Sequence, residues 1–585
     1  MVSDLPTYDR FPAIAAPSTP DSLWQGWRSI LERIRGEVSK GARLLAVECY
    51  PGVFVNEIAS AFAEALSPHL MLRTEDCYRE PCDIDRMVAR DLTCDPVFGR
   101  INGFIIEDFA DPLRLASQRA RLPEARDGLA VIAGCGTELI APEPDLLIYA
   151  DLPRWEIQRR QRADEVGNLA ARNESERPAL KYKRGFFLDW RVADRIKKRL
   201  LGTCRFLLDT TDRSAPKMVA GETFRAALRH AVTRPFRVVP FFDPGPWGGQ
   251  WMREICGLDD RAPNYAWCFD CVPEENSLRF DFDGVCVEVP AIDLVYRHPR
   301  ELLGEAVHAR FGTEFPIRFD LLDTMGGGNL SLQVHPLTEY IQDKFGMAYT
   351  QDESYYMVDA APGAGVYLGL RSGIDRDRMA GQLREAECGN GPFDADAFVN
   401  RWPARRHDHF LIPAGTIHCS GKNGMVLEIS ATPYIFTFKL WDWGRLGLDG
   451  RPRPIHLEHG LANIQWDRDT DWVAGNLINQ VQTVAEGPGW TEQRTGLHER
   501  EFIETRRHWF DQPVLHETRG GVHVQNLVEG AAAVVESPDG AFDEFVVHYA
   551  ETFIVPAAVG RYVVRPLSKG MPKCATIRAS VRTST

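Results

Sequence analysis

Three polar side chains occupy alternate positions in the segment LSLQVHP, residues 330–336: Ser331, Gln333 and His335. Residues two apart on a strand point to the same face, so an extended segment here places the three polar groups together. A buried polar row costs free energy unless it is paired, and a metal ion pairs it well. Imidazole suits zinc, iron, copper or nickel, and an amide oxygen can join it as a harder ligand. The spacing therefore favours part of a metal site.

Two further candidate ligands follow along the chain. Glu353 begins the strand-like run ESYYMVDA, and His418 follows the Pro-Ala-Gly turn of IPAGTIHCSG. Taken singly, a strand histidine is more often a hydrogen-bonded core residue, and a glutamate at a strand start is more often solvated. Together with Gln333 and His335 they would leave coordination positions open for water or substrate oxygens, which a catalytic metal requires.

The elements that must position these residues are short β-strands. After the segment TRPFRVVPFFDPGPWGG, strand-like runs alternate with Gly, Pro, Asp and Asn to the end of the chain, which predicts antiparallel sandwiches or barrels. HDHFLIPAGTIHCSGKNGMVLEI and HYAETFIVPAAVGRYVV share a strand, a Pro-Ala turn and another strand, which predicts two related barrels. A histidine follows the turn only in the first.

The preceding part of the chain has a different pattern of apolar and polar residues. From Asp21 to His230, apolar runs such as RLLAVECYP, LAVIAGCG and DLLIYADLP alternate with helical stretches, which predicts a parallel sheet covered by helices. We therefore expect a multidomain protein with a tail at 1–20, an α/β domain at 21–232, a metal-binding β domain at 235–465 and a second β domain at 466–585.

Length, charge and cysteine content limit the classes of partner and the cellular location that we expect. The 585 residues exceed what one core accommodates, and the net charge of −14 argues against nucleic acid or an anionic membrane as the partner. The N-terminus lacks the basic patch and apolar core of a signal peptide, and no apolar stretch would span a bilayer, so we expect a cytoplasmic protein. Thirteen scattered cysteines do not form a disulfide framework, and we expect Cys268 and Cys271 to be unconnected thiols.

Four segments carry a family resemblance. LSLQVHP, DESYYMVDAAPGAGVYLGL, FLIPAGTIHCSGKNGMVLEIS and LWDWGR resemble class I mannose-6-phosphate isomerases, zinc enzymes of the cupin fold. The resemblance begins at RVVPFFDPGPWGGQWMREICGL and covers roughly the last 350 residues. It implies two cupin (jelly-roll) barrels and one Zn2+ held by Gln333, His335, Glu353 and His418. It also implies interconversion of mannose 6-phosphate and fructose 6-phosphate through an enediol.

Other residues are predicted to act on the sugar. Lys439 and Glu428 are our candidates for handling protons or sugar hydroxyls. Ser331, Trp247 and Arg445 are predicted to contact the substrate, which is a small sugar or sugar phosphate.

Several positions depart from the family pattern. Gln351 and Asp320 stand where the family has lysines, and Lys439 stands where it has an arginine. Phosphate is bound by charge-assisted hydrogen bonds, so the phosphate site is either rebuilt or absent. Arg318 and Lys422 could supply charge, although we expect both to be solvated. Two alternatives therefore stay open: a metal-dependent isomerase of a different sugar, one that lacks phosphate or bears another acidic group, and a non-catalytic carbohydrate sensor.

The N-terminal domain also carries a weak resemblance. The segment DLLIYADLPRWEIQRRQRADEVG resembles the strand and basic lid helix of uridine-kinase-like P-loop enzymes. The phosphate-binding loop is degenerate, however, because ECYPGVFVNEIAS retains only Gly52 and no lysine. We expect no nucleotide-binding residues here, but a scaffold or a homo-oligomer contact. The alternative is a nucleotide- or sugar-sensing module with Arg159, Arg160 and Arg162 as an anion clamp.

Overall fold

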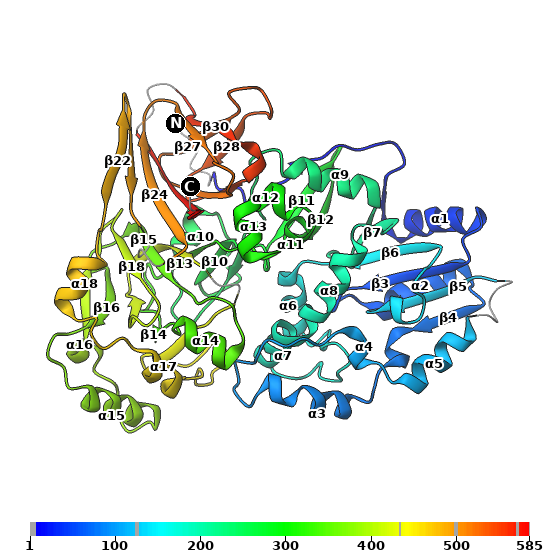
Figure 1. Ribbon diagram of the computed structural model, residues 1–585, viewed down its shortest axis with the longest axis horizontal. Coiled ribbons are helices and arrows are strands. Elements are labelled where there is room, and N and C mark those ends of the chain that lie inside the picture. Colours follow the sequence, from blue (N-terminus) through cyan, green and yellow to red (C-terminus); the bar gives the residue numbers. More distant parts are fainter. Residues whose placement is uncertain (1–6, 123–127, 432–433, 497–500, 569–572, 584–585) are drawn as a thin grey trace. The chain divides into compact units, whose positions relative to one another are not determined.

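The structure is a computed structural model that describes residues 7–122, 128–431, 434–496, 501–568 and 573–583 (Figure 1). The chain folds into two compact units. A β unit contains Val232–Asn276, Pro299–Thr585 and the described part of Met1–Pro12, and an α/β unit contains Ala13–Ala231 and Ser277–His298.

The α/β unit is built on a seven-stranded sheet. Its strands, in spatial order, are β2 (Leu23–Gln25), β8 (Lys217–Ala220), β7 (Phe206–Asp209), β6 (Leu146–Asp151), β3 (Leu44–Cys49), β5 (Ala130–Gly134) and β4 (Leu70–Arg73). The strands from β7 to β4 are parallel, and β8 is antiparallel to both of its neighbours, β7 and β2. Strands β3 and β5 are buried almost throughout, as expected where helices cover both faces of a sheet. The predicted parallel sheet is present, and the kinase-like resemblance stays a prediction.

Helices connect these strands. They are α1 (Gly26–Ser39), α2 (Val55–Leu66), α3 (Pro81–Leu92), α4 (Ile106–Phe109), α5 (Pro112–Arg121), α6 (Arg154–Arg162), α7 (Pro178–Arg184), α8 (Trp190–Leu200) and α9 (Gly221–Ala231). A small sheet of β1 (Ile14–Ala15), β11 (Ser277–Phe282) and β12 (Val285–Pro290), followed by α11 (Ile292–Arg297), completes the unit.

Residues 277–298 were expected in the metal-binding β domain, but they pack with the α/β unit. Asp293 explains part of this placement. Its carboxylate is fully buried and lies 3.0 Å from Nζ of Lys197 in α8, which also lies 2.8 Å from Asp151 at the end of β6. Buried charges persist only when paired, so this ion cluster fixes the segment against the sheet.

The proposed anion clamp on α6 is not formed. Arg160 is fully buried, donates to Glu156 at 2.7 Å and to the carbonyl oxygen of Gly52 at 2.9 Å, and therefore serves the packing of its own unit. Arg159 pairs with the same carboxylate at 2.6 Å, and Arg162 is exposed. Arg159 and Arg160 are thus committed to Glu156 rather than to an anion.

The β unit contains two pairs of antiparallel sheets. In the first pair, one sheet orders β18 (His409–Ile412), β15 (Glu353–Ala360), β20 (Gly424–Ser430), β13 (Arg318–Asp323), β10 (Trp267–Cys271) and β9 (Phe241–Asp243). The facing sheet orders β17 (Val399–Pro403), β16 (Gly365–Leu370), β19 (His418–Ser420), β14 (Leu332–Val334) and β21 (Phe438–Trp441). We call this pair the first barrel.

The second barrel follows in the chain. One sheet orders β22 (Gln482–Gly487), β23 (Trp490–Arg494), β24 (Ile503–Phe510), β31 (Cys574–Val581), β26 (His523–Glu529) and β29 (Thr552–Val555). The other orders β25 (Val514–Glu517), β30 (Arg561–Pro566), β27 (Ala532–Glu536) and β28 (Phe545–His548). The prediction of an antiparallel β-rich C-terminal part is confirmed.

Short helices decorate the β unit. They are α10 (Trp251–Ile255), α12 (Pro299–Leu303), α13 (Glu305–Phe311), α14 (Thr338–Phe345), α15 (Arg376–Glu387), α16 (Ala395–Phe398), α17 (Leu457–Asn463) and α18 (Thr470–Asn476). Among the described residues, no helix is both long enough and apolar enough to cross a membrane. Cys268 and Cys271 are buried free thiols, as predicted.

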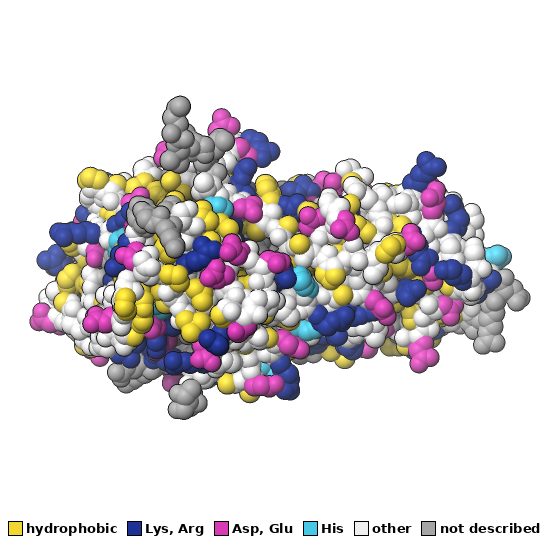
Figure 2. Space-filling view, turned by 90° about the horizontal axis from the view of Figure 1, so that it is seen from above, with side chains coloured by type: hydrophobic (Ala, Val, Ile, Leu, Met, Phe, Trp, Pro, Cys, Tyr) yellow, Lys and Arg dark blue, Asp and Glu magenta, His cyan; other side chains and the backbone are white. Residues whose placement is uncertain are grey.

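Surface charge is mixed on the face that Figure 2 shows. Lysine and arginine side chains are interspersed there with aspartate and glutamate, and no continuous basic area is visible. Neighbouring charges of opposite sign cancel within a Debye length, about 8 Å at physiological ionic strength. This face therefore offers no basic stripe of the kind that binds nucleic acid.

Candidate metal centre

One sheet of the first barrel brings three of the predicted residues to a single face. Gln333 of β14 lies opposite His418 of β19 and, on its other side, opposite Lys439 of β21. Opposing residues of antiparallel strands point to the same face. The next residue on that face of the chain is His335, two positions after Gln333.

The facing sheet supplies the acidic side of the site. Cross-strand pairing between β13, β20 and β15 forms two polar rows. The first row is Arg318, Ser430 and Glu353, and the second is Asp320, Glu428 and Tyr355. All six side chains are buried, so their charges act in a medium of low dielectric constant.

Glu353 is the residue on which the two histidines converge. Its Oε2 lies 3.1 Å from Nε2 of His335, and its Oε1 lies 2.9 Å from Nε2 of His418. All three side chains are fully buried, and their ligand atoms lie within 4.8 Å of one another. Two imidazoles and one carboxylate are a set that divalent zinc prefers.

The outer nitrogens of both imidazoles are fixed by backbone carbonyls. Nδ1 of His335 lies 2.9 Å from the carbonyl oxygen of Phe436, and Nδ1 of His418 lies 2.8 Å from that of Thr416. A neutral imidazole that donates from Nδ1 to a backbone carbonyl presents a lone pair at Nε2, as metal-binding histidines usually do.

The buried ligand atoms face one another, which supports a cation at this point. Nε2 of His335 and Oε1 of Glu353 are buried, and their polar neighbours are the other ligand atoms of the cluster, at 3.1 and 2.9 Å. A cation held among two imidazole nitrogens and a carboxylate would compensate the cost of burying them together. The residues present therefore fit a divalent metal ion.

The charges of the cluster keep the carboxyl of Glu353 ionised. Burial would raise the pKa of Glu353, but His335 and His418 hold the pKa of its carboxyl well below the ordinary value. Burial would also lower the pKa of His335, but the Glu353 carboxylate raises it. The site thus keeps an ionised carboxylate where a cation would be held.

Gln333 and Ser331 complete the predicted polar row. The amide nitrogen of Gln333 lies 3.2 Å from Nε2 of His418, and Ser331 donates from Oγ to the amide oxygen at 3.1 Å. Gln333 is thus adjacent to the His-Glu-His cluster, and Ser331 orients its amide. Both residues lie where the alternation predicted them.

A second buried group surrounds the cluster on the acidic side. Gln351 donates from Nε2 to Glu353 at 3.0 Å and to Glu428 at 3.4 Å. Burial raises the pKa of Glu428 well above its usual value, and Glu353 and Asp320 raise it further. Burial also raises the pKa of Asp320 to about 6, although Arg318 lowers it.

The expectation that Arg318 is solvated is wrong. Its side chain is 5% exposed, and its guanidinium lies 3.7 Å from Asp320. The charge of Asp320 compensates the cost of burying Arg318. Lys422, in contrast, is exposed as expected.

The remaining predicted residues have other neighbours. Lys439 is partly buried on the Gln333 face. Trp247 packs its ring at 4.7 Å against Trp267. Arg445 bonds to Asp442 at 2.6 Å and also donates to the carbonyl of Asn329, so both Trp247 and Arg445 have structural partners. A substrate contact stays a prediction for each.

Sequence reasoning missed three polar residues beside the cluster. Gln351 was noted only as a departure from a family pattern, and Tyr355 and Ser430 were not noted at all. The signal was the same period of two: Tyr355 follows Glu353 by two residues, and Ser430 follows Glu428 by two. Both carry a hydroxyl that is buried without a hydrogen-bond partner among the described residues.

Comparison with known proteins gives different results for the two units. A family described as a Domain of unknown function (DUF8485) matches residues 26–233, nearly all of which lie in the α/β unit. Mannose-6-phosphate isomerase of Streptococcus mutans is 28% identical over 217 residues, which are 37% of this chain and 63% of that enzyme. Mannose-6-phosphate isomerase ManA of Bacillus subtilis is 24% identical over 233 residues, which are 40% of this chain and 69% of that enzyme.

A solved structure of mannose 6-phosphate isomerase from Bacillus subtilis covers 59% of this chain and 99% of that protein, with 19% identity and a TM-score of 0.48. The sequence alignments therefore span about two thirds of the curated enzymes and less than half of this chain. Over as many as 233 residues, this chain is similar to the mannose-6-phosphate isomerases and contains a cupin region of their type.

Proposed function

We propose that the protein is a zinc-dependent aldose–ketose isomerase that interconverts mannose 6-phosphate and fructose 6-phosphate. The observation that carries the proposal is the fully buried His335–Glu353–His418 cluster inside the first barrel. The similarity to curated mannose-6-phosphate isomerases supports the choice of substrate.

Four residues would hold the metal: His335, His418, Glu353 and Gln333. When bound, zinc would act as a Lewis acid toward the sugar oxygens at carbons one and two. The surrounding side chains are buried, and a closed, dry site strengthens every charge interaction within it.

Isomerisation also needs a group that takes a proton from carbon two and returns it to carbon one. Glu428 is our candidate, because its carboxyl lies on the same sheet face as Glu353 and next to Gln351. Burial and the neighbouring carboxyls raise the pKa of Glu428, and a carboxylate with a raised pKa is a stronger base. Lys439 approaches from the opposite sheet and would stabilise negative charge on a sugar oxygen.

A second candidate substrate is an aldose without phosphate. The specific observation in its favour is the sign of the buried charge around the cluster. Asp320 and Glu428 are acidic, Gln351 is neutral, and Arg318 is already paired with Asp320. A phosphate dianion gains most from unpaired cations. This site would accept neutral hydroxyls at lower cost.

Turnover measurements distinguish these proposals. Zinc-loaded protein is incubated in D2O with mannose 6-phosphate or with mannose, and the products are followed by NMR. The enediol route predicts deuterium at carbon one of the ketose product. We expect Glu428→Gln to lower kcat by about 100-fold or more with zinc content unchanged. The matched control, Glu339→Gln on the exposed side of α14, should keep full activity.

Each result has a definite meaning. Turnover of mannose alone would replace the phosphorylated substrate with the unphosphorylated one. Failure of the fully zinc-loaded protein to convert either sugar would reject isomerisation of both substrates.

A further inference from the structure

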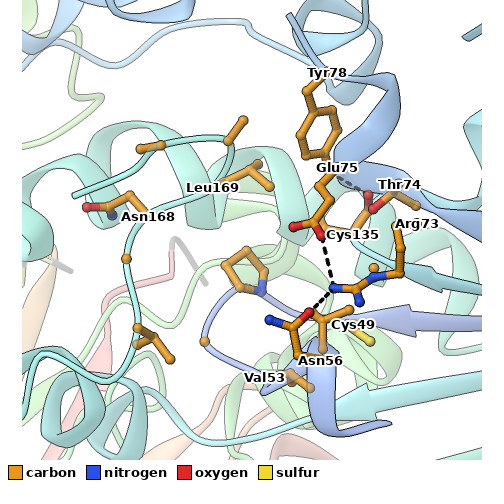
Figure 3. Close-up of a pocket in the computed structure, with 18 of the residues that line it drawn as sticks. Cys49, Val53, Asn56, Arg73, Thr74, Glu75, Tyr78, Cys135, Asn168 and Leu169 are labelled. Carbon is orange, nitrogen blue, oxygen red and sulfur yellow. Dashed lines mark hydrogen bonds and ion pairs between the residues drawn. The ribbon is translucent and has the colours of Figure 1, made fainter. Parts of the chain in front are cut away.

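The α/β unit contains a cavity that the isomerase chemistry does not use. It has a volume of about 1080 Å³ and lies at the carboxyl ends of β3, β4 and β5 (Figure 3). Strand β3 lies between β5 and β6, so the chain passes to one side of β3 for β4 and β5 and to the other for β6 and β7. In open α/β sheets, ligands bind outside the carboxyl ends of the strands at such a reversal.

The floor of the cavity carries a cation. Arg73 is the last residue of β4, and its side chain is only 19% exposed. Its guanidinium donates to Asn56 Oδ1 at 2.6 Å and lies 3.1 Å from Glu75, as the dashed lines in Figure 3 show. Nε of Arg73 is buried and has no hydrogen-bond partner among the described residues. The guanidinium therefore retains donor capacity.

Charges at the rim are largely neutralised in pairs. Arg114 pairs with Glu80, and Arg213 pairs with Glu57. Arg114 and Arg213 are exposed, so solvent screens their charges. Arg73 is the least exposed of these three arginines, so solvent screens its charge least.

The ion pair between Glu75 and Arg73 is weak enough for a ligand to replace it. Its side chain is 63% exposed, while that of Arg73 is 19% exposed, and exposed ion pairs contribute about 1 kcal/mol or less. A ligand anion could therefore take the place of the Glu75 carboxylate at little cost. Val53 and Leu169 line the same cavity and offer apolar surface to the rest of a ligand.

The cavity walls are held in shape by packing. Gly52 has φ +106°, and a Cβ there would lie 2.9 Å from the Ile157 side chain. The buried Arg160 donates to the carbonyl oxygen of Gly52 at 2.9 Å, and its guanidinium lies 4.2 Å from the centre of the Phe54 ring. These contacts hold the loop after β3 in one conformation. A preformed concave site with a few placed polar groups is the usual form of a small-molecule pocket.

We propose that this cavity binds a small organic anion whose phosphate or carboxylate group pairs with Arg73. The Glu75 carboxylate occupies the position of that group in the ligand-free protein. The organic body of the ligand lies toward Val53 and Leu169. This site is separate from the metal centre and does not depend on isomerase activity.

Calorimetric titration tests the proposal on the full-length chain at low ionic strength. The probes are inorganic pyrophosphate and succinate, which separate the two headgroups. All variants carry His335→Ala and His418→Ala, so that a metal ion cannot bind the probe. We expect Arg73→Gln to weaken binding of the preferred probe at least about tenfold. Glu75→Gln should tighten it by up to about fivefold, because the internal competitor loses its charge.

The matched control is Arg28→Gln, since Arg28 lies on α1, is 94% exposed and does not line the cavity. It should bind like its parent. Equal affinity in the Arg73→Gln and Arg28→Gln variants, or no binding of either probe at millimolar concentration, would overturn the proposal. If Arg73→Gln does not fold, the Glu75→Gln variant decides, and unchanged or weaker binding there counts against the site.

Discussion

Replacing Lys197 by methionine should strongly destabilise the α/β unit. Nζ of Lys197 lies 2.8 Å from Asp151 and 3.0 Å from Asp293, and all three side chains are buried. Methionine preserves much of the volume and removes the charge, which leaves two carboxylates without a cation. Removing one partner of a buried ion pair costs about 3–5 kcal/mol. We expect a loss of that size in the free energy of unfolding.

Hydrogen exchange measures this loss within the full chain. Amides of β6 should exchange faster in Lys197→Met by the factor that corresponds to 3–5 kcal/mol, roughly 150-fold to several thousandfold. The matched control is Lys198→Met, because Lys198 is the next residue on α8 and is exposed. It should change the free energy by less than about 1 kcal/mol. Equal protection of β6 in the two variants would refute the role assigned to the buried cluster.

The pH dependence of the Lys197→Met variant gives an independent check. Burial raises the pKa of Asp151 and Asp293, and Lys197 opposes that rise, so its removal raises both further. When the pKa of a carboxyl is higher in the folded protein than in the unfolded chain, its contribution to the free energy of unfolding is fully present below the unfolded-state pKa. That contribution is lost as the pH rises through the folded-state pKa. The variant's deficit should therefore grow between pH 5 and pH 7.5, after correction for intrinsic exchange rates. A deficit that shrinks over this range would contradict the reasoning.

Three further predictions concern other parts of the chain. Burial lowers the pKa of His508 to about 4 and holds the pKa values of His516 and His523 well below the ordinary value. The free energy of unfolding should therefore be highest above the unfolded-state pKa near 6.5, and below that pH it should decrease by about 1.4 kcal/mol per pH unit for each histidine. Urea midpoints at pH 7 and pH 5.5 measure this decrease, and equal midpoints would contradict it. Gly134→Ala should destabilise the α/β unit by about 1–3 kcal/mol, because φ is +133° and the new Cβ would lie 2.0 Å from Thr74 Oγ1, whereas Gly103→Ala meets no atom within 4 Å and serves as the control in the same exchange experiment. Glu353→Gln should weaken zinc binding by more than the roughly 10–100-fold lost when a residue that only hydrogen-bonds to a metal ligand is removed. Competition with a zinc chelator measures the affinity, and unchanged affinity would remove Glu353 from the site.

The sequence contained enough to place the residues of the candidate metal centre. Gln333 and His335 alternate on one strand, and turn residues mark where His418 begins the next. Period-two alternation depends on local backbone geometry alone, so it survives without knowledge of the tertiary fold. The same rule, extended from Glu353 to Tyr355, would have added another residue of the barrel interior.

Other features depend on contacts between distant residues and have no local signal. The sequence of Ser277–His298 is typical of ordinary β-structure. Its place in the α/β unit depends on the contact between Asp293 and Lys197, which are nearly one hundred residues apart in the chain. Arg318 looks solvated until Asp320 is seen to pair with it inside the barrel. Arg160 looks like a free basic residue on a helix, but its bonds to Glu156 and to Gly52 bury it.

Metal content tests the central claim most directly. Zinc is measured by elemental analysis on the native chain, on a His335→Ala, His418→Ala double variant and on a His69→Ala control, since His69 is exposed in the other unit. We expect about one zinc ion per chain in the native protein and the control, and almost none in the double variant. Undiminished zinc in the double variant would show that the metal is bound elsewhere and would contradict the assignment of the centre.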